Sequence, residues 1–471
     1  MKTVNKWTLV LGLSFVFLSS CSIGKKYSRP ELDLPENYKD QQLTVTADTL
    51  LLPWKTFFRD PLLIGLIEKA LYKNNDISVA MMSMEQLELS YKQAKLELLP
   101  VVDLSAGASR NWFSKNSLNS SLGEQTGKSY TDDYTATFKL TWEADIWGKA
   151  KMQRENARAN YLAQKENLSA LKTRIIVQTA QAYYNLLALD EQIKIANRNV
   201  VLSDSTLRAI NLQYNSGQVN SLAVGQAEAQ LKTAELLVPL SLQEIAVQEN
   251  ALSILCGSYP DKIERAESLQ YAIPQETFPV GIPAMLLSRR PDVKAAEYAI
   301  IAANAKSGLA KAAMFPSISL TPSIGTNSYE FNKWFDLPGS LVKNLGANLT
   351  APIFQKKSLK TAYEIAKIEQ EKSATQFRQS VLTAVGEVSD AYAKSKHADE
   401  RLSLAKLKKS SLEKATKDAL LLYKSGMVTY LEVIVAQNNA LQNDLELITI
   451  QKDKLYAVID LYRALGGGVD D

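Results

Sequence analysis

Two long stretches of the chain mix apolar and polar residues in the pattern of long helices. One covers 148–214 and the other 356–424, and both are nearly free of glycine and proline. At about 1.5 Å per residue, each helix would be on the order of 100 Å long. In the first stretch, residues recur at alternating steps of four and three, which is the heptad spacing of a coiled coil. That seam comprises Ala182, Leu186, Leu189, Ile193, Ala196, Val200, Ser203, Leu207, Ile210 and Tyr214.

Shorter helices are predicted around these two. They cover 62–98, 221–255, 291–314 and 429–465. Pro239 lies inside the second of them and predicts a kink there, because proline cannot donate the helical hydrogen bond.

Four segments have a period of two instead, with apolar residues alternating with small polar ones. They lie at about 101–110, 131–146, 317–326 and 345–354, and we predict a strand at each. The same alternation is typical of a membrane barrel and of a soluble sheet with one buried face, so the strands alone do not decide between these. Four strands cannot close a barrel, and open strand edges do not occur in lipid. A membrane location would therefore require several copies of the chain.

One turn occurs twice in the sequence, as LQYNSGQVNSL and as LLYKSGMVTYL. Tyr214 matches Tyr423 and Gly217 matches Gly426, at a constant offset of 209 positions. Glycine suits a chain reversal between two helices because it tolerates a positive φ. Each half of the chain also has a proline, two strands and a long helix in the same order, which indicates a duplication.

The duplication predicts the domain organisation. We expect a first repeat at 62–256, a connector at 257–283, a second repeat at 284–466 and a short tail at 467–471. Residues 21–61 would precede the first repeat as a separate N-terminal segment.

Residues 1–20 have the pattern of a signal peptide, with two lysines before a short apolar run. The run ends in Leu-Ser-Ser-Cys21, which resembles a bacterial lipobox, so we expect cleavage after Ser20 and lipidation of Cys21. Several acyl chains together would anchor the chain stably. Ser22 follows instead of Asp, which favours the outer membrane over the inner one. An ordinary signal peptide with an incidental cysteine is the alternative.

The composition excludes several classes of function. The formal charge is only +4, which is too small to indicate a nucleic-acid partner. There is one histidine, His397, and the two cysteines are Cys21 and Cys256. A histidine-based metal site or a catalytic triad is therefore not expected. The chain also has no phosphate-binding loop, so we expect neither an enzyme nor a cofactor.

Several short motifs, taken together, resemble those of the TolC-like outer membrane factors, specifically the lipoprotein branch. The most specific is RRPDV at 289–293 followed by Ala-Glu at 296–297. The others are YSRP at 27–30, WKTFFRDPL at 54–62, FPSISL at 315–320, APIF at 351–354 and LYRALGGG at 461–468. The resemblance covers nearly the whole chain after the signal peptide.

The resemblance implies a mainly α-helical fold with a membrane β-barrel. Three copies would form a 12-stranded barrel in the outer membrane and a long periplasmic α-helical tube. It implies the passive exit duct of a tripartite efflux system, coupled to a periplasmic adaptor and an inner-membrane pump. A lipid-anchored periplasmic coiled-coil scaffold without a pore is the alternative, although it leaves the paired strands unexplained.

The resemblance also assigns roles to the repeated turns. They would be the periplasmic tips of helical hairpins, where Tyr214, Gly217, Tyr423 and Gly426 contact the adaptor.

Family members often place acids six and nine residues beyond the second glycine, facing the pore. Glu432 and Val435 occupy these two positions here, so one acid is present and one is missing. We therefore expect Glu432 to form an acidic ring at the periplasmic aperture, or else to be a solvated helix residue.

Overall fold

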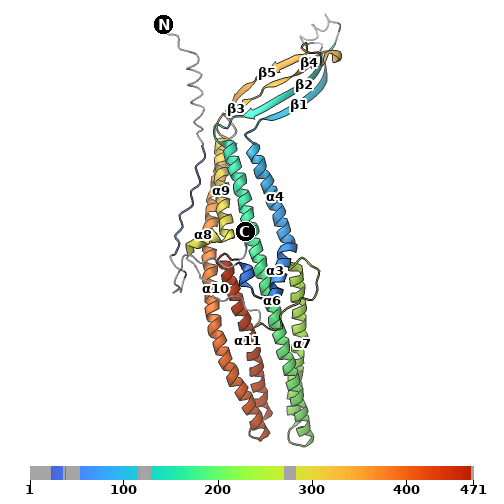
Figure 1. Cartoon of the computed structure of the whole chain (residues 1–471), viewed down its shortest axis with the longest axis vertical. Coiled ribbons are helices and arrows are strands. Elements are labelled where there is room, and N and C mark those ends of the chain that lie inside the picture. The colour runs from blue at the N-terminus through green and yellow to red at the C-terminus, as the bar shows by residue number, and fades with distance from the viewer. Residues whose placement is uncertain are drawn as a thin grey trace. The chain divides into compact units, whose positions relative to one another are not determined.

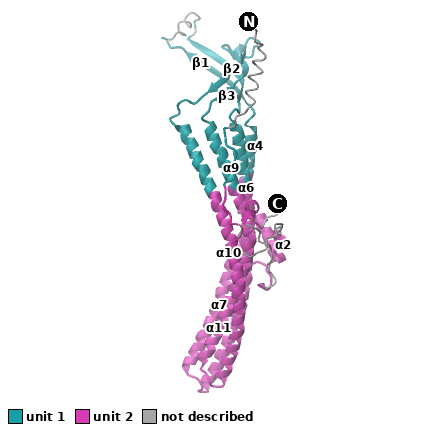
Figure 2. Cartoon of the chain, turned by 90° about the vertical axis from the view of Figure 1, so that its left-hand side faces the viewer, with its two compact units in different colours: residues 1–30, 85–162, 297–375 teal, residues 31–84, 163–296, 376–471 magenta. Residues whose placement is uncertain are grey.

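A computed structural model describes residues 23–35, 38, 53–114, 116, 127, 129–269 and 283–467. The chain divides into two compact units, which are coloured separately in Figure 2. Unit 1 contains 1–30, 85–162 and 297–375, and unit 2 contains 31–84, 163–296 and 376–471. Each unit therefore combines segments from both halves of the sequence.

Helices make up most of the described chain (Figure 1), and the strands lie in unit 1 (Figure 2). The helices are α2 (Trp54–Phe57), α3 (Pro61–Lys73), α4 (Asn75–Leu96), α6 (Lys149–Asn215), α7 (Ser221–Leu255), α8 (Leu286–Arg289), α9 (Pro291–Ala312), α10 (Ser358–Lys424) and α11 (Tyr430–Ala464), with short 3₁₀ turns η2 (Pro283–Met285) and η3 (Phe331–Lys333). The strands are β1 (Val101–Trp112), β2 (Tyr130–Glu143), β3 (Ser317–Leu320), β4 (Ser323–Ser328), β5 (Leu341–Asn344) and β6 (Ala347–Thr350).

The predicted long helices are confirmed as α6 and α10, each within two residues of the expected bounds. Along the heptad seam of α6, Leu186 and Ile210 are almost fully buried, which confirms that this stripe faces neighbouring helices. α7 continues as one helix past Pro239, and the kink predicted there stays a prediction.

The single helix predicted over 62–98 is wrong, because α3 and α4 meet at Asn74. The Asn74 side-chain oxygen accepts hydrogen bonds from the amides of Asp76 (2.9 Å) and Ile77 (3.2 Å), which begins a new helix. Its amide nitrogen donates to the Leu255 carbonyl at 2.9 Å. A buried contact with a distant helix end therefore fixes the break.

The first strand pair largely follows the prediction, with β1 and β2 joined in an antiparallel hairpin. The predicted strand at 131–146 is too long, because β2 ends at Glu143. Asp145 instead accepts hydrogen bonds from the amides of Ala150 (3.0 Å) and Lys151 (3.2 Å) in the first turn of α6. This residue begins the helix and so cannot continue the strand.

The second strand pair needs a larger correction. The strand predicted at 317–326 is divided into β3 and β4 at Pro322, which has no amide hydrogen to continue the ladder. The strand predicted at 345–354 is reduced to β6, which ends before Pro352. β5 lies between the predicted strands at 317–326 and 345–354, where no strand was predicted.

The strands form one sheet in which β2 is central. β1 pairs along one edge of β2, and β4 and β3 pair along the other, followed by β5 on β4 and β6 on β3. In this register Leu104, Phe138 and Ile324 align across the strands on one face. Asp103 and Lys139 align on the other face, so the predicted apolar and polar faces are confirmed.

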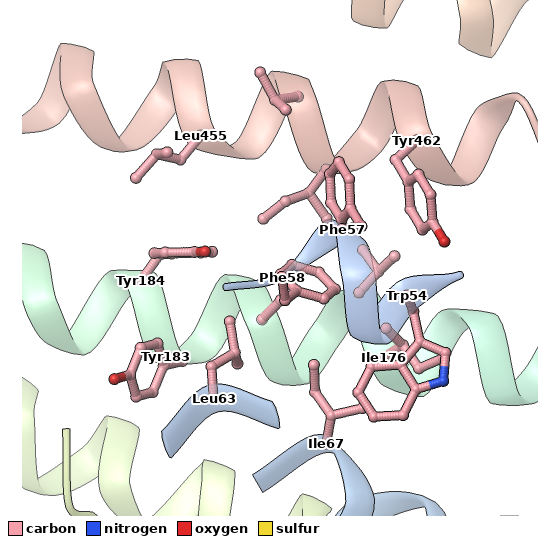
Figure 3. Close-up of a cluster of buried hydrophobic side chains, with 14 of the residues drawn as sticks. Trp54, Phe57, Phe58, Leu63, Ile67, Ile176, Tyr183, Tyr184, Leu455 and Tyr462 are labelled. Carbon is pink, nitrogen blue, oxygen red and sulfur yellow. The ribbon is translucent and has the colours of Figure 1, made fainter. Parts of the chain in front are cut away.

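The core of unit 2 contains an aromatic cluster, shown in Figure 3. Phe57 of α2 is fully buried and stacks on Tyr462 of α11, with 4.0 Å between ring centroids. The Tyr183 hydroxyl donates to Asp60 at 2.5 Å and accepts from the Ala266 amide at 3.0 Å. The cluster therefore attaches the N-terminal segment and the connector to the helices.

The RRPD motif has a structural role. Arg290 is buried and pairs with Asp292 (2.6 Å) and Glu387 (2.7 Å), and it donates to the Ala464 carbonyl at 3.2 Å. Burial opposes ionisation of Asp292, but the hydrogen bonds from Arg290 prevail and hold its pKa below the usual value. The start of α9 is thereby joined to α10 and to the end of α11.

Candidate functional site at the hairpin tips

The first candidate tip is the turn between α6 and α7. Gly217 has a φ of 76°, and its amide donates to the Tyr214 carbonyl at 2.9 Å. The Gln218 amide donates to the Gln213 carbonyl at 2.8 Å. This glycine ending satisfies carbonyls that the end of α6 leaves open, and Asn220 then caps α7.

The second tip, between α10 and α11, repeats this geometry. Gly426 has a φ of 72°, and its amide donates to the Tyr423 carbonyl at 3.0 Å. The Met427 amide donates to the Leu422 carbonyl at 2.9 Å. The two turns are thus alike in backbone hydrogen bonding as well as in sequence.

The two tips contact each other. The Tyr423 hydroxyl of the second tip donates a hydrogen bond to the Gln213 side-chain oxygen of the first. Tyr214, the counterpart of Tyr423, is instead 47% exposed. Tyr423 also packs against a buried apolar cluster. Burial raises the pKa of Tyr430, a member of this cluster, to about 12. The cluster consists of Ile210, Ala227, Tyr430 and Val433.

Glu432 lies in the first turn of α11 and is exposed. The Thr429 hydroxyl donates to its carboxylate at 2.6 Å and accepts from the Leu431 amide at 3.3 Å. Together these contacts resemble a capping box, and the Thr429 hydrogen bond is the main cause that lowers the pKa of Glu432. The acid therefore has a local role in starting the helix, whatever it does at an aperture. The first tip has Asn220 and Ala223 at the equivalent positions, without an acid.

Apolar side chains also lie exposed around the tips. We name this group the tip surface, and Val435 is a half-exposed neighbour of it on α11. Large exposed apolar groups in a folded protein often mark a contact with another molecule. The tip surface consists of Leu212, Leu222, Met427 and Leu431.

Three further features concern metals, membrane helices and lipid. Within the described ranges no group of three or more His, Cys, Asp or Glu side chains could hold a metal ion. None of the described helices combines the length and apolar character needed to cross a membrane. Cys21, the expected lipidation residue, lies outside the described residues.

Both halves of the chain match one family model, described as outer membrane efflux protein, over 66–258 and 282–467. The chain belongs to the outer membrane efflux protein family. Proteins of this family reside in the outer membrane and are channels rather than enzymes.

Several relatives of this efflux protein match it end to end. The cation efflux system protein CusC of Escherichia coli (strain K12) is 30% identical over 455 residues, which cover 96% of this chain and 97% of CusC. The toluene efflux pump outer membrane protein TtgC of Pseudomonas putida is 28% identical, with 99% and 96% covered.

Solved structures have the same fold. A crystal structure of CusC superposes with a TM-score of 0.84 at 29% identity and covers 95% of this chain and all of that one. The open state of the Neisseria gonorrhoeae MtrE outer membrane channel gives 0.83 at 26% identity, with 95% and 98% covered.

Sequence reasoning missed two features of the tips of this efflux protein. The capping box was readable as Thr429-Tyr-Leu-Glu432. The bond between Tyr423 and Gln213 had no signal in the sequence, because it joins residues from different repeats.

Proposed function

We propose that the chain is the outer-membrane exit channel of a tripartite efflux system. It conducts cargo passively from a periplasmic adaptor and an inner-membrane pump to the outside. The observation that carries this proposal is the family match in both halves, combined with relatives that it matches over nearly their full length. Transport energy would come from the pump.

The working unit in this proposal is a homotrimer. Among the described strands, β1 is bonded only to β2, and β5 and β6 are each bonded on one side only. Exposed strand edges invite pairing with another chain, and none can remain open in lipid. β3 and β4 together count as one strand position of the barrel, and so do β5 and β6. Each chain then contributes four positions, and three copies supply a closed 12-stranded barrel.

The tips are the proposed adaptor contact. Tyr214, Gly217, Tyr423 and Gly426 form the two turns, and the tip surface beside them presents exposed apolar side chains. Apolar groups of this kind suit a protein partner, because association removes them from water.

Glu432 and Val435 would lie at the periplasmic aperture, where three copies of Glu432 form an acidic ring. The exposure of Glu432 and its lowered pKa support a carboxylate that is ionised at neutral pH. Cation selectivity in a planar bilayer tests the ring. Glu432→Ala should reduce it, and unchanged selectivity together with unchanged conductance would refute the ring.

The chain is further proposed to be anchored by acyl chains on Cys21. The relative SilC of Salmonella typhimurium, 28% identical over 467 residues, is named a probable outer membrane lipoprotein.

Cargo would be selected by the pump, since the relatives CusC and TtgC are named for cations and for toluene.

One experiment separates the channel from the lipid-anchored scaffold. The Cys21→Ser variant, exported on a signal peptide that is cleaved without lipidation, is fractionated, treated with carbonate and run unheated on an SDS gel. A channel stays in the outer-membrane fraction and migrates as a heat-dissociable trimer. A variant that becomes a soluble periplasmic protein would contradict the channel and support the scaffold.

A further inference from the structure

The chain immediately after the expected lipidation residue is held in an extended path along α9 (Figure 1). We name residues 23–30 the N-terminal strap. The strap and the part of α9 from Glu297 onward both belong to unit 1. The amide of Ile23 donates to the Trp147 carbonyl at 3.5 Å, and the Lys25 carbonyl accepts from the Asn304 side chain at 2.9 Å.

The other end of the strap is clamped by one carboxylate. Glu297 accepts from the Tyr27 hydroxyl at 3.0 Å, and its two oxygens accept from Arg29 at 2.7 Å and 2.8 Å. The Glu297 side chain is 15% exposed and that of Arg29 is 49% exposed. Charge-assisted pairs of this forked geometry are among the stronger hydrogen bonds in proteins. Burial, followed by the Glu297 charge, raises the pKa of Tyr27, so its hydroxyl remains a donor at neutral pH.

Two glycines permit the close approach of strap and helix. A Cβ added to Gly308 of α9 would lie 2.3 Å from the Met152 sulfur and 3.3 Å from the Gly24 Cα. A Cβ added to Gly24 would lie 2.7 Å from the same sulfur. Met152 is almost completely buried, so this crossing is packed on both sides.

The order of these contacts gives the direction of the strap. Residues 24, 25 and 27 meet 308, 304 and 297 in turn, so the strap runs antiparallel to α9. Its N-terminal end therefore lies toward the end of α9 that leads into β3. Trp147 belongs to the segment between β2 and α6 and donates through its indole to the Pro316 carbonyl at 2.6 Å. Ile23 thus lies at the junction between the strands and the helices of unit 1.

We propose that the strap is a positioning device for the lipid anchor, with Glu297 as its clamp. Cys21 precedes Ile23 by two residues, a span of at most about 7 Å. With the strap clamped, acyl chains on Cys21 enter the membrane beside the junction of strands and helices. This inference rests on the proposed lipidation and channel function.

Trypsin tests the clamp directly, because Lys25 and Lys26 are exposed while the backbone around them is held. Cleavage after either lysine separates the acylated N-terminus from the rest of the chain. Proteolysis of a held segment follows the population of its open form. We expect Glu297→Gln and Arg29→Gln, in the full-length protein in detergent, to be cut about tenfold faster, which corresponds to about 1.4 kcal/mol.

Glu364→Gln is the matched control, because this exposed glutamate belongs to the same unit and pairs with Lys360 at 3.8 Å. Its cleavage rate should equal that of the wild-type chain. The exchanged pair Arg29→Glu with Glu297→Arg should restore slow cleavage. The thermal unfolding midpoint should stay unchanged in every variant, which distinguishes a local clamp from general destabilisation.

Mass spectrometry identifies the cleavage site in each chain. The release of metabolically incorporated palmitate, measured in the same samples, reports separation of the acylated N-terminus. Equal cleavage rates in the wild-type, Glu297→Gln and Arg29→Gln chains would overturn the clamp while leaving the proposed channel intact. A chain that is cut slowly but carries no palmitate would overturn the anchoring role and the proposed lipidation, without affecting the clamp.

Discussion

The hydrogen bond from Tyr423 to Gln213 joins the hairpin tips of the two repeats, and removing it should loosen them. Tyr423→Phe deletes the donor but keeps the ring, whose centroid lies 5.7 Å from that of Tyr430. A neutral hydrogen bond contributes about 0.5–1.5 kcal/mol. Since Tyr423 is only partly buried, we take the lower part of this range, about 0.5–1 kcal/mol. Losing that free energy changes the ratio of separated to contacting tips by a factor of roughly two to five.

Single-channel recording in planar bilayers measures this effect. If the contact between the tips restrains opening, Tyr423→Phe should raise the open fraction about two- to fivefold. Tyr214→Phe is the matched control, because Tyr214 is the repeat counterpart and is 47% exposed. Burial raises the pKa of Tyr423, so its hydroxyl stays protonated and the effect should be constant between about pH 6 and about pH 9.

The reasoning is refuted if Tyr423→Phe and Tyr214→Phe both behave as the wild-type channel. A double-mutant cycle with Gln213→Ala sharpens the result, because two partners in one hydrogen bond must show non-additive effects. Additive changes in the open fraction would mean that the two side chains act separately.

Four further predictions concern stability. Glu432→Gln should speed hydrogen exchange in the first turn of α11 at neutral pH. The lowered pKa of Glu432 means that its carboxylate stabilises this turn at pH values above the ordinary glutamate pKa. The difference in exchange rate between the variant and the wild-type chain should therefore vanish as the pH falls through the folded-state pKa. Phe57→Ala should cost about 3–5 kcal/mol in denaturant unfolding, because the ring is fully buried against Tyr462. Gly426→Ala should lower the free energy of unfolding by about 1–2 kcal/mol, because Gly426 has a positive φ, although a Cβ there meets no neighbouring atom. Gly426→Asn should lose less, because Asn adopts a positive φ more readily than Ala, and a smaller loss for Ala than for Asn would contradict this reasoning. Burial raises the pKa of Asp460, so protonation of this group should stabilise the folded state as the pH falls through its folded-state pKa toward the ordinary aspartate pKa. Over that range the denaturant midpoint of the wild-type chain should rise relative to that of Asp460→Asn.

The long helices were predictable because their periodicity and their glycine turns agree. α6 and α7 begin and end within a residue or so of the expected positions. The break at Asn74 was not predictable, since it depends on a hydrogen bond to Leu255, far away in the sequence. The second strand pair failed for a different reason, because Pro322 and Pro352 interrupt ladders in which the side-chain alternation continues.

For the candidate site, sequence comparison within the chain located both turns but not their difference. Tyr214 and Tyr423 are identical in type and equivalent in position, yet one is exposed and the other bonds across the tips. Only the packing of the two hairpins separates them. The repeat boundaries at 62–256 and 284–466 and the pore-facing role of Glu432 stay predictions.

The stacking of Phe57 on Tyr462 has a consequence for biosynthesis. These rings come from opposite ends of the chain, roughly 400 residues apart, so the cluster cannot close until synthesis and export are nearly complete. Until then Trp54, Phe57 and Phe58 are left without Tyr462 on one side. A chain that has not yet closed this cluster exposes aromatic surface and is therefore prone to aggregate.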